Sequence, residues 1–362
     1  MTELNLNVNK SHKQYNYCLD FMKGIACLFV VWMHCEFPGK TGVIVQAISR
    51  FCVPFFFMVS GYFSGDMSKT ARGGLIKNKK VKHIFKITLW SSLFYLAWAI
   101  IRNLIWHDKS LNISISQAAV WLVFNQPYVI SGHLWFLFAL LYDYILVSVF
   151  DGKKIHNKQY LFGAISMALL FVLGQGVHLL GVQIPIPETV RGSFGREIPQ
   201  FVRIPNFIYR NWLIEGFAFF MLGRWIKENK DSVNISNVAL YIIIVVSTVL
   251  CLVERQIMGR DFGVNICTLP QVLALFLYAV KNPERHAGFV QQVGRDCSML
   301  VYVLHFFVWD IVAIFYSALG VGDNIVAKYL LPIIVVILSV LVALVFNWIV
   351  MKIKKESQKI TS

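Results

Sequence analysis

A histidine and a lysine stand eleven residues apart in the first long apolar segment of the chain, at His34 and Lys23. At about 100° per residue, this spacing places both side chains on one face of a helix, about 16 Å apart along its axis. Asp20 precedes Lys23 by three residues, a spacing at which opposite charges pair on a helix. Ionisable groups inside a membrane span are costly and usually face a protein interior or an aqueous cavity. We therefore predict that this segment contributes to a functional site.

His34 lies about 24 Å along the helix from the start of the segment, which places it near the far side of a membrane. Imidazole titrates near neutral pH, so a histidine there could act as a general base that takes a proton from an incoming hydroxyl group. The competing interpretation is a structural histidine that hydrogen-bonds between two helices. The residue types alone leave both interpretations open.

Later apolar segments contain further polar side chains that could take part in chemistry. Such groups within a span are candidate site residues by default, although each can instead form a hydrogen bond between two helices. Ser60 has the additional alternative that, together with Gly61, it allows two helices to pack closely. Asp143 and Asp310 are further carboxyl groups within apolar segments. The other candidates are His133, Glu215, Tyr302 and His305.

The most basic stretch of the chain runs from Lys69 to Lys86 and holds seven basic residues, among them Lys79 and Lys82. One interpretation is that these residues bind the phosphates of a cofactor on the cytoplasmic side. The other is that they only set the membrane topology and contact anionic lipids, and the charge by itself slightly favours this second interpretation.

The composition indicates a membrane protein. The 362 residues are 57% hydrophobic and 15% charged, with a mean hydropathy of +0.61. Soluble proteins carry about a quarter charged residues. Here the apolar residues form runs of membrane length, which predicts an all-α, multi-pass integral membrane protein. The start of the chain shows no cleavage site after a short apolar stretch, so we expect the first span to be retained.

The net charge of +15 does not indicate nucleic-acid binding, because the basic residues are concentrated in alternate loops. The bias between the two sets of loops is roughly two to one, which predicts that both termini are cytoplasmic. The seven cysteines lie in or beside apolar runs without the spacing of metal ligands. We therefore expect buried thiols and no metal site.

About ten spans are predicted. Segment 113–127 is too short to cross easily, so we expect an interfacial or re-entrant helix there. The last span is long and contains Pro332, which predicts a tilt or a kink. The predicted regions are a cytoplasmic tail (1–17), a membrane domain (18–351) and a basic cytoplasmic tail (352–362). The predicted spans are 18–37, 46–65, 83–104, 133–150, 160–180, 208–226, 236–254, 265–281, 297–318 and 326–351.

Four short motifs follow one another between residues 19 and 305. They are Leu19-Asp20-x-x-Lys23-Gly24 with His34 after it, Pro54-Phe-Phe-Phe with Ser60-Gly61-Tyr62, His133-Leu-Trp-Phe-Leu, and Ser298 followed by Tyr302-Val-Leu-His305. Each motif alone is weak evidence, whereas all four in order are strong. Together with ten predicted spans, they resemble the membrane acyltransferase-3 family, bacterial enzymes that O-acylate cell-surface glycans.

The resemblance implies an O-acetyltransferase of the bacterial cytoplasmic membrane. It would transfer an acyl group, expected to be acetyl, from acyl-CoA to a hydroxyl of a cell-surface or lipid-linked polysaccharide. By the same resemblance, His34 would act as the base, Asp20 and Lys23 would line the path of acetyl-CoA, and Lys79 and Lys82 would contact its phosphates. The phospholipid bilayer is the other expected partner, and neither a metal nor nucleic acid is implied.

The chain departs from the family pattern at two places. Lys23 stands where the family usually has arginine, which keeps the charge but loses the bidentate fork of a guanidinium. The pair Lys79 and Lys82 replaces an Arg-x-x-Arg motif before the third span. If those arginines bind the phosphates of the donor, then donor affinity or donor choice differs in this chain.

Transport is the rival class of function, because a bundle lined by polar groups could also carry a polysaccharide or a small acid. A transporter of this kind often contains an inverted repeat, and none is evident in the sequence. A third class, a sensor or assembly subunit without catalysis, would leave His34 and the basic stretch unexplained. Turnover of acetyl-CoA by the purified protein separates the first class from the other two.

Overall fold

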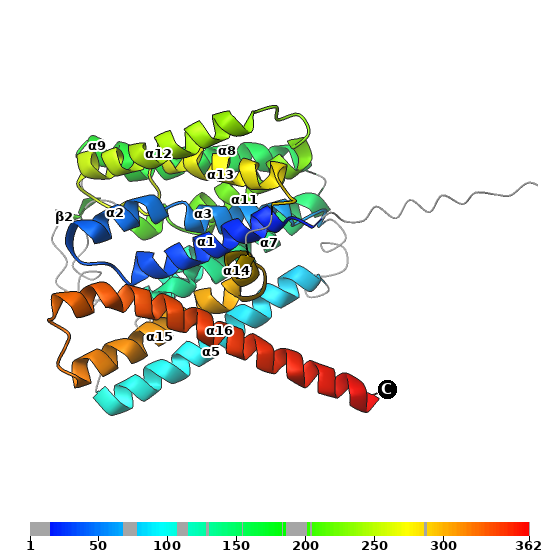
Figure 1. Ribbon diagram of the computed structural model, residues 1–362. Helices are drawn as coiled ribbons and strands as arrows, with labels where there is room; N and C mark the ends of the chain where they lie inside the picture. The colour runs from blue at the N-terminus through cyan, green and yellow to red at the C-terminus, as the bar shows by residue number, and fades with distance from the viewer. Residues whose placement is uncertain are drawn as a thin grey trace, which may run out of the picture.

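The computed structural model shows an all-α protein (Figure 1). It describes residues 15–67, 78–106, 115–127, 130–153, 155–182, 184–185, 201–202, 205–285 and 288–361. The α-helices are α1 (Tyr17–His34), α2 (Gly39–Ser49), α3 (Cys52–Tyr62), α5 (Lys79–Trp106), α6 (Ile115–Phe124), α7 (Trp135–Gly152), α8 (His156–Phe171), α9 (Val177–Leu179), α11 (Phe217–Asn229), α12 (Asn237–Met258), α13 (Thr268–Lys281), α14 (Gly288–Gln292), α15 (Ser298–Ala318) and α16 (Ile325–Thr361).

Shorter elements connect these helices. Two are 3₁₀-turns, η3 (Gly132–Leu134) and η6 (Asn206–Ile208). Three are π-helical turns that continue directly into α-helices, namely η4 (Val172–Gly176), η7 (Trp212–Gly216) and η8 (Val293–Cys297). In the described part of the chain, strands are limited to an antiparallel pair of two residues each, β1 (Ile184–Pro185) and β2 (Phe201–Val202).

Within the described residues, eight helical segments are long and apolar enough to cross a membrane. This confirms the predicted all-α integral membrane fold. The two other predicted spans correspond to η7 with α11, which carries several charges, and to α13. At 14 residues α13 is about 21 Å long, shorter than a hydrocarbon core of about 30 Å. The count of ten spans and the side of the termini therefore stay predictions.

The second predicted span, 46–65, is not one continuous helix. The helix is interrupted at Arg50 and Phe51, between α2 and α3, although both residues keep helical backbone angles and Gly39–Tyr62 as a whole is long enough to cross a membrane. Pro54 explains this break, because a proline has no N–H to donate and its ring collides with the carbonyl four residues earlier, that of Arg50. Pro54 is tolerated where it stands, in the first turn of α3. The turn carries Arg50 into the interior of the protein, where it is 6% exposed.

In segment 113–127, the described residues 115–127 form one helix, the ten-residue α6. Its length of about 15 Å is half of what a membrane crossing requires. The structure thus agrees with the prediction that this segment does not span the membrane.

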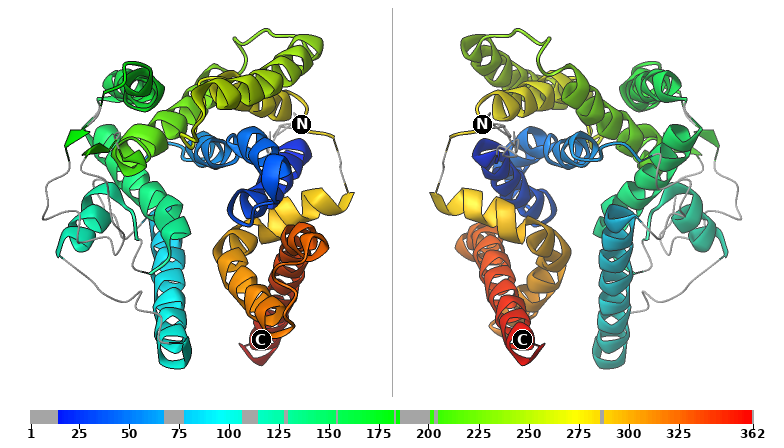
Figure 2. Two further views of the ribbon diagram at one scale, coloured as in Figure 1. Left: turned by 90° about the vertical axis from the view of Figure 1, so that its left-hand side faces the viewer. Right: turned by 90° about the vertical axis from the view of Figure 1, so that its right-hand side faces the viewer.

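The helices form a bundle with α1 and α3 in a middle layer (Figures 1 and 2). Helices α8, α12 and α13 lie on one side of this layer, and α5, α15 and α16 lie on the other. Close packing of α3 against α11 depends on two glycines, because a Cβ atom on Gly61 would overlap the Phe220 carbonyl and one on Gly223 would overlap the Met58 carbonyl. Gly61 therefore has the packing role that the sequence left open for it.

Candidate active site

Helix α1 carries its ionisable groups at opposite ends. The Asn16 side chain caps the start of the helix by accepting a hydrogen bond from the Leu19 N–H at 2.7 Å. The helix ends at His34, because Cys35 adopts an extended conformation. This fixed length keeps His34 about 16 Å from Lys23 along the axis.

His34 lies against the middle of α15. Its ring centroid is 5.4 Å from that of His305 and 4.9 Å from that of Phe306. The Phe306 ring also stacks on His133, with centroids 4.4 Å apart, and His133 and His305 are 5.1 Å apart. We call His34, His133 and His305 the histidine cluster.

Hydrogen bonds to backbone carbonyls determine which nitrogen of His305 carries its proton. The Nδ1 atom lies 2.7 Å from the Tyr302 carbonyl and 3.2 Å from the Val301 carbonyl, so Nδ1 must be the donor. The Nε2 atom then holds a lone pair. It is buried and has no hydrogen-bond partner among the described residues.

Both ring nitrogens of His133 form hydrogen bonds. Its Nε2 donates to the Val303 carbonyl at 3.2 Å, and its Nδ1 accepts from the Ser131 hydroxyl at 2.7 Å. The Tyr302 hydroxyl donates to the carbonyl of His133 itself. The 3₁₀-turn η3 is thereby tied to α15, and two sequence-predicted candidates, His133 and Tyr302, serve to build the wall beside His34.

Two arginine–carboxylate pairs adjoin the histidine cluster. Arg50 pairs with Asp261, and the Arg210 Nε atom lies 3.3 Å from the buried Glu215 carboxylate. Both arginines lie close enough for their charges to act on His34. We call Arg50, Arg210, Glu215 and Asp261 the charged quartet.

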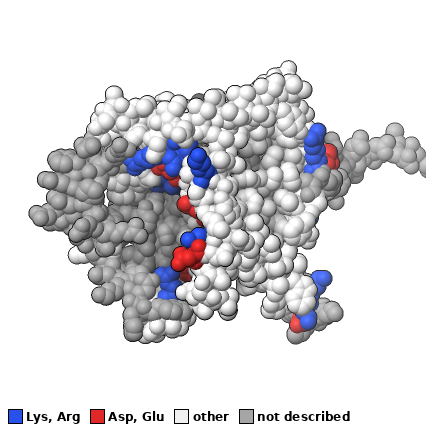
Figure 3. All heavy atoms as spheres, turned by 60° about the vertical axis from the view of Figure 1, so that its left-hand side comes forward, with Lys and Arg blue, Asp and Glu red and all other residues white. Residues whose placement is uncertain are grey.

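Asp261 lies in the loop between α12 and α13, outside the spans. Burial raises the pKa of its carboxyl group, but the Arg50 guanidinium and the Gly263 N–H outweigh burial and hold that pKa below its ordinary value. The carboxylate is therefore charged at neutral pH, and the Arg50 pair is ionic. On the molecular face near this end of the bundle, acidic and basic side chains gather around a hollow (Figure 3).

The sequence identified Glu215 as a candidate but missed Arg50, Arg210 and Asp261. They come from the α2–α3 turn, the segment before η7 and the α12–α13 loop, and only the fold brings these segments together. The signal that could have found Arg50 is its place inside a predicted span, four residues before Pro54.

Asp20 and Lys23 form the predicted ion pair at the other end of α1, with the Lys23 Nζ atom 2.9 Å from Asp20 Oδ1. The Tyr15 hydroxyl also donates to the Asp20 carboxylate. Gly294 of η8 packs directly on the Asp20 backbone, where a Cβ atom would overlap the carbonyl. The pair is thus a separate feature from the histidine cluster, joined to it only by the helix.

We expect Asp20 and Lys23 to behave as a unit in a double-mutant cycle. Replacing either residue by alanine leaves the other charge without its partner at a site that is only 12–20% exposed. The losses of function in the two single variants should therefore add up to more than the loss in the double variant. Acyl transfer per correctly inserted molecule is the measurement. Additive losses would show that the two side chains do not cooperate, and Lys23→Arg, which keeps the charge, should be tolerated.

Lys79 and Lys82, which precede the predicted third span (83–104), already belong to the helix of that span. They occupy the exposed face at the start of α5, where Lys82 follows Lys79 by one helical turn. Helix formation begins there because the Asn78 side chain caps it, accepting from the Lys80 N–H at 2.8 Å. Among the described residues, neither lysine forms a hydrogen bond or an ion pair with Asp20 or Lys23. Lys69, Arg72 and Lys77 lie outside the described part.

Ser60 and Asp310 have structural partners. The Ser60 hydroxyl donates to the Phe56 carbonyl one turn earlier on α3, at 2.9 Å. Asp310 accepts from Trp98 Nε1 at 2.8 Å and from Arg102 at 3.0 Å, which ties α15 to α5. Asp143 is completely buried on α7, and its carboxyl oxygens find no partner in the described part of the chain.

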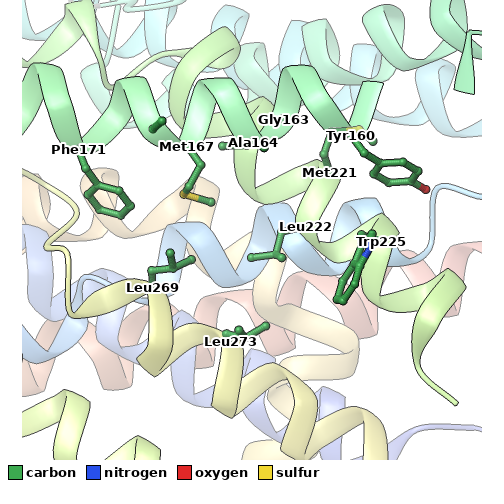
Figure 4. Close-up of a pocket in the computed structure, with 12 residues that line it drawn as sticks. Tyr160, Gly163, Ala164, Met167, Phe171, Met221, Leu222, Trp225, Leu269 and Leu273 are labelled. Carbon is green, nitrogen blue, oxygen red and sulfur yellow. The ribbon is translucent and has the colours of Figure 1, made fainter. Parts of the chain in front are cut away.

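A cavity of about 610 Å³ lies between α8, α11 and α13 (Figure 4). Its lining is apolar apart from the polar atoms of Tyr160 and Trp225, so it offers no general base and no group for binding phosphate. Among the described residues, no group of three or more histidines, cysteines or carboxylates is arranged to hold a metal ion. The histidine cluster with the charged quartet is therefore the best candidate for chemistry.

Comparison with known proteins supplies the family. A family model described as an acyltransferase domain, Acyl_transf_3, matches residues 16–352, nearly the whole chain. The chain belongs to this acyltransferase-3 family. This match confirms the resemblance to the family that the four motifs indicated. All four motifs lie within the matched range.

Two curated relatives are named as racemases. This chain is 24% identical to a serine/alanine racemase of Enterococcus gallinarum, in an alignment that covers 63% of this chain and 32% of the relative. It is also 24% identical to an amino-acid racemase of Enterococcus faecalis over 94% of this chain and 47% of the relative. The chain thus spans less than half the length of these relatives. No solved structure matches it.

Proposed function

We propose that this membrane acyltransferase moves an acetyl group from acetyl-CoA to a hydroxyl group of a cell-surface or lipid-linked polysaccharide in the bacterial cytoplasmic membrane. The observation that carries the proposal is His34, a half-buried imidazole at the end of α1 in a cluster of three histidines. The family supplies the reaction class, and this imidazole is the group that we assign as its general base.

In the proposed step, His34 takes the proton of the acceptor hydroxyl while the oxygen attacks the thioester carbonyl. A carbon–oxygen bond forms, the carbon–sulfur bond breaks, and the thiolate of CoA leaves and regains a proton. Asp20 and Lys23 line the donor path at the opposite end of α1. Because they stand about 16 Å from His34 along the helix, the donor has to extend along that face of α1.

Acetyl-CoA turnover by the purified protein tests the proposal directly. Release of free CoA should depend on the intact histidine cluster and should rise when a polysaccharide acceptor is supplied. Mass spectrometry of surface glycans from cells with and without the gene would then identify the acetylated sugar. A pure, folded protein that consumes no acetyl-CoA under any acceptor condition would exclude this function.

We expect Lys79 and Lys82 to bind the phosphates of the donor. Neutralising both should raise the apparent KM for acetyl-CoA with a smaller effect on the acceptor, because a phosphorylated thioester needs charge-assisted contacts. Lys352 and Lys355 of the α16 tail are exposed and predicted on the same side, so their neutralisation is the matched control. An unchanged donor KM, with altered membrane insertion instead, would leave Lys79 and Lys82 a role in topology alone.

A second candidate function is a membrane unit that binds or carries an amino acid. The observation that favours it is the pair of relatives named as amino-acid racemases, one of which aligns over 94% of this chain. Uptake of radiolabelled serine or alanine into vesicles holding the protein distinguishes this candidate from acyl transfer. Uptake without acetyl-CoA turnover would replace the first proposal by the second.

A further inference from the structure

His34 and His305 have complementary hydrogen-bonding needs. The His34 imidazole forms no hydrogen bond with any residue in the described part of the chain. The Nε2 atom of His305 is buried there without a partner, on a ring whose Nδ1 is already held by the Tyr302 carbonyl. An unused acceptor therefore stands beside a ring that has an N–H to donate.

The two rings are close enough to meet. Their centroids are 5.4 Å apart and their planes are inclined by 31°. Each ring nitrogen lies about 1 Å from its own centroid, so a centroid separation of 5.4 Å leaves room for a nitrogen of each ring to face the other at about 3 Å, the length of a hydrogen bond. His133 cannot offer the same acceptor, because Ser131 and the Val303 carbonyl occupy both of its nitrogens.

We infer that His305 is the positioning residue of His34: its Nε2 accepts an N–H hydrogen bond from His34. That bond assigns the proton of the neutral His34 ring to one nitrogen and leaves the other nitrogen as the base. A partner that fixes the tautomer and orientation of a histidine commonly works in this way. That this base takes a proton from a hydroxyl group rests on the proposed function. The His34–His305 hydrogen bond does not depend on that function.

Four titratable or charged groups act most strongly on His34. They are His305 and His133 from α15 and η3, and Arg50 and Arg210 from the charged quartet. The arginines keep their carboxylate partners and stay charged across the neutral pH range. A change in the pH dependence of His34 on mutating His305 therefore reports on the ring pair and not on a change in the two arginines.

Two substitutions at His305 separate positioning from packing. His305→Gln carries an amide oxygen near the place of Nε2, so it can still accept from His34. His305→Asn carries an amide nitrogen near the place of Nδ1, so it keeps the bond to the Tyr302 carbonyl but loses the acceptor. A purely structural His305 would tolerate Asn better than Gln, and a positioning His305 would tolerate Gln better than Asn.

The measurement is the rate at which diethyl pyrocarbonate modifies His34 in the purified full-length protein, followed by mass spectrometry across pH. This reagent reacts with the unprotonated ring nitrogen. Its rate therefore measures the reactivity of the His34 base without requiring acyl transfer. We expect His305→Asn to lower the rate about 10- to 100-fold, the size of the loss in affinity or activity when a metal-binding histidine loses its hydrogen-bond partner, with His305→Gln retaining most of it. His178→Gln, which alters a histidine bonded to the Met258 carbonyl at 3.1 Å, is the matched control and should change nothing.

Equal rates in the Gln and Asn variants, or a faster rate in Asn, would overturn the inference. Acetyl-CoA turnover is measured on the same preparations and should follow the same order. If the wild-type protein shows no turnover while His34 reactivity still follows the Gln-over-Asn order, the positioning role stands and the proposed acyl transfer fails. The two ideas are thus tested separately.

Discussion

His34→Ala should abolish acyl transfer while leaving membrane insertion and folding intact. Removal of a general base typically costs 10²–10⁴-fold in rate, and no other described imidazole has free access to the same position, because His133 is fully hydrogen-bonded and His305 is buried behind His34. The measurement is acetyl-CoA turnover per molecule of purified protein, together with acetylation of surface glycan in cells.

His178→Ala provides the control for this experiment. It removes an imidazole from α9, a helix that takes no part in the histidine cluster, and should leave turnover at the wild-type level. Near-normal glycan acetylation by a well-expressed His34→Ala protein would remove His34 from the mechanism. The histidine cluster would then be a packing feature between α1 and α15.

Asp151→Ala should produce the largest loss of stability. The Asp151 carboxylate accepts two hydrogen bonds from Arg224, at 2.8 and 3.0 Å, and one from the Met67 N–H at 2.9 Å. Both side chains of this ion pair are at most 5% exposed, so alanine leaves the buried Arg224 guanidinium with only the longer pair to the partly exposed Glu228, 3.8 Å from its Nε atom. We expect a cost of about 3–5 kcal/mol, measured by chemical unfolding in detergent.

The combined change Asp151→Leu with Arg224→Met should cost less than Asp151→Ala, since no uncompensated charge remains in the interior. Asp323→Ala removes a fully exposed partner of Lys328 and should give no measurable loss. An Asp151→Ala protein as stable as the wild type would mean that Arg224 finds another partner. The link from α7 to α11 would then not depend on this pair.

The spans illustrate what hydropathy can and cannot predict. The apolar spans of α12 and α16, Asn237–Met258 and Ile325–Ile353, were predicted within a few residues, because a membrane crossing requires about 20 apolar residues in a row. The break between α2 and α3 was missed, because an apolar run has the same hydropathy whether or not it bends. Pro54 was visible in the sequence, yet its effect on the Arg50 carbonyl is a matter of backbone geometry.

The sequence by itself determined the local features of this protein: the membrane-spanning helices, the Asp20–Lys23 pair, and the positions of His34, His133 and His305 along their segments. These depend on composition and on spacing within one helix, which are fixed by covalent order. It did not determine that three histidines from α1, η3 and α15 meet, that Arg50 and Asp261 pair across 211 residues, or that Lys79 and Lys82 start a helix apart from Asp20. Only the tertiary structure decided those relations, because contact between distant segments depends on how helices pack, and packing is set by side-chain shape and close backbone approach at sites such as Gly61 and Gly294.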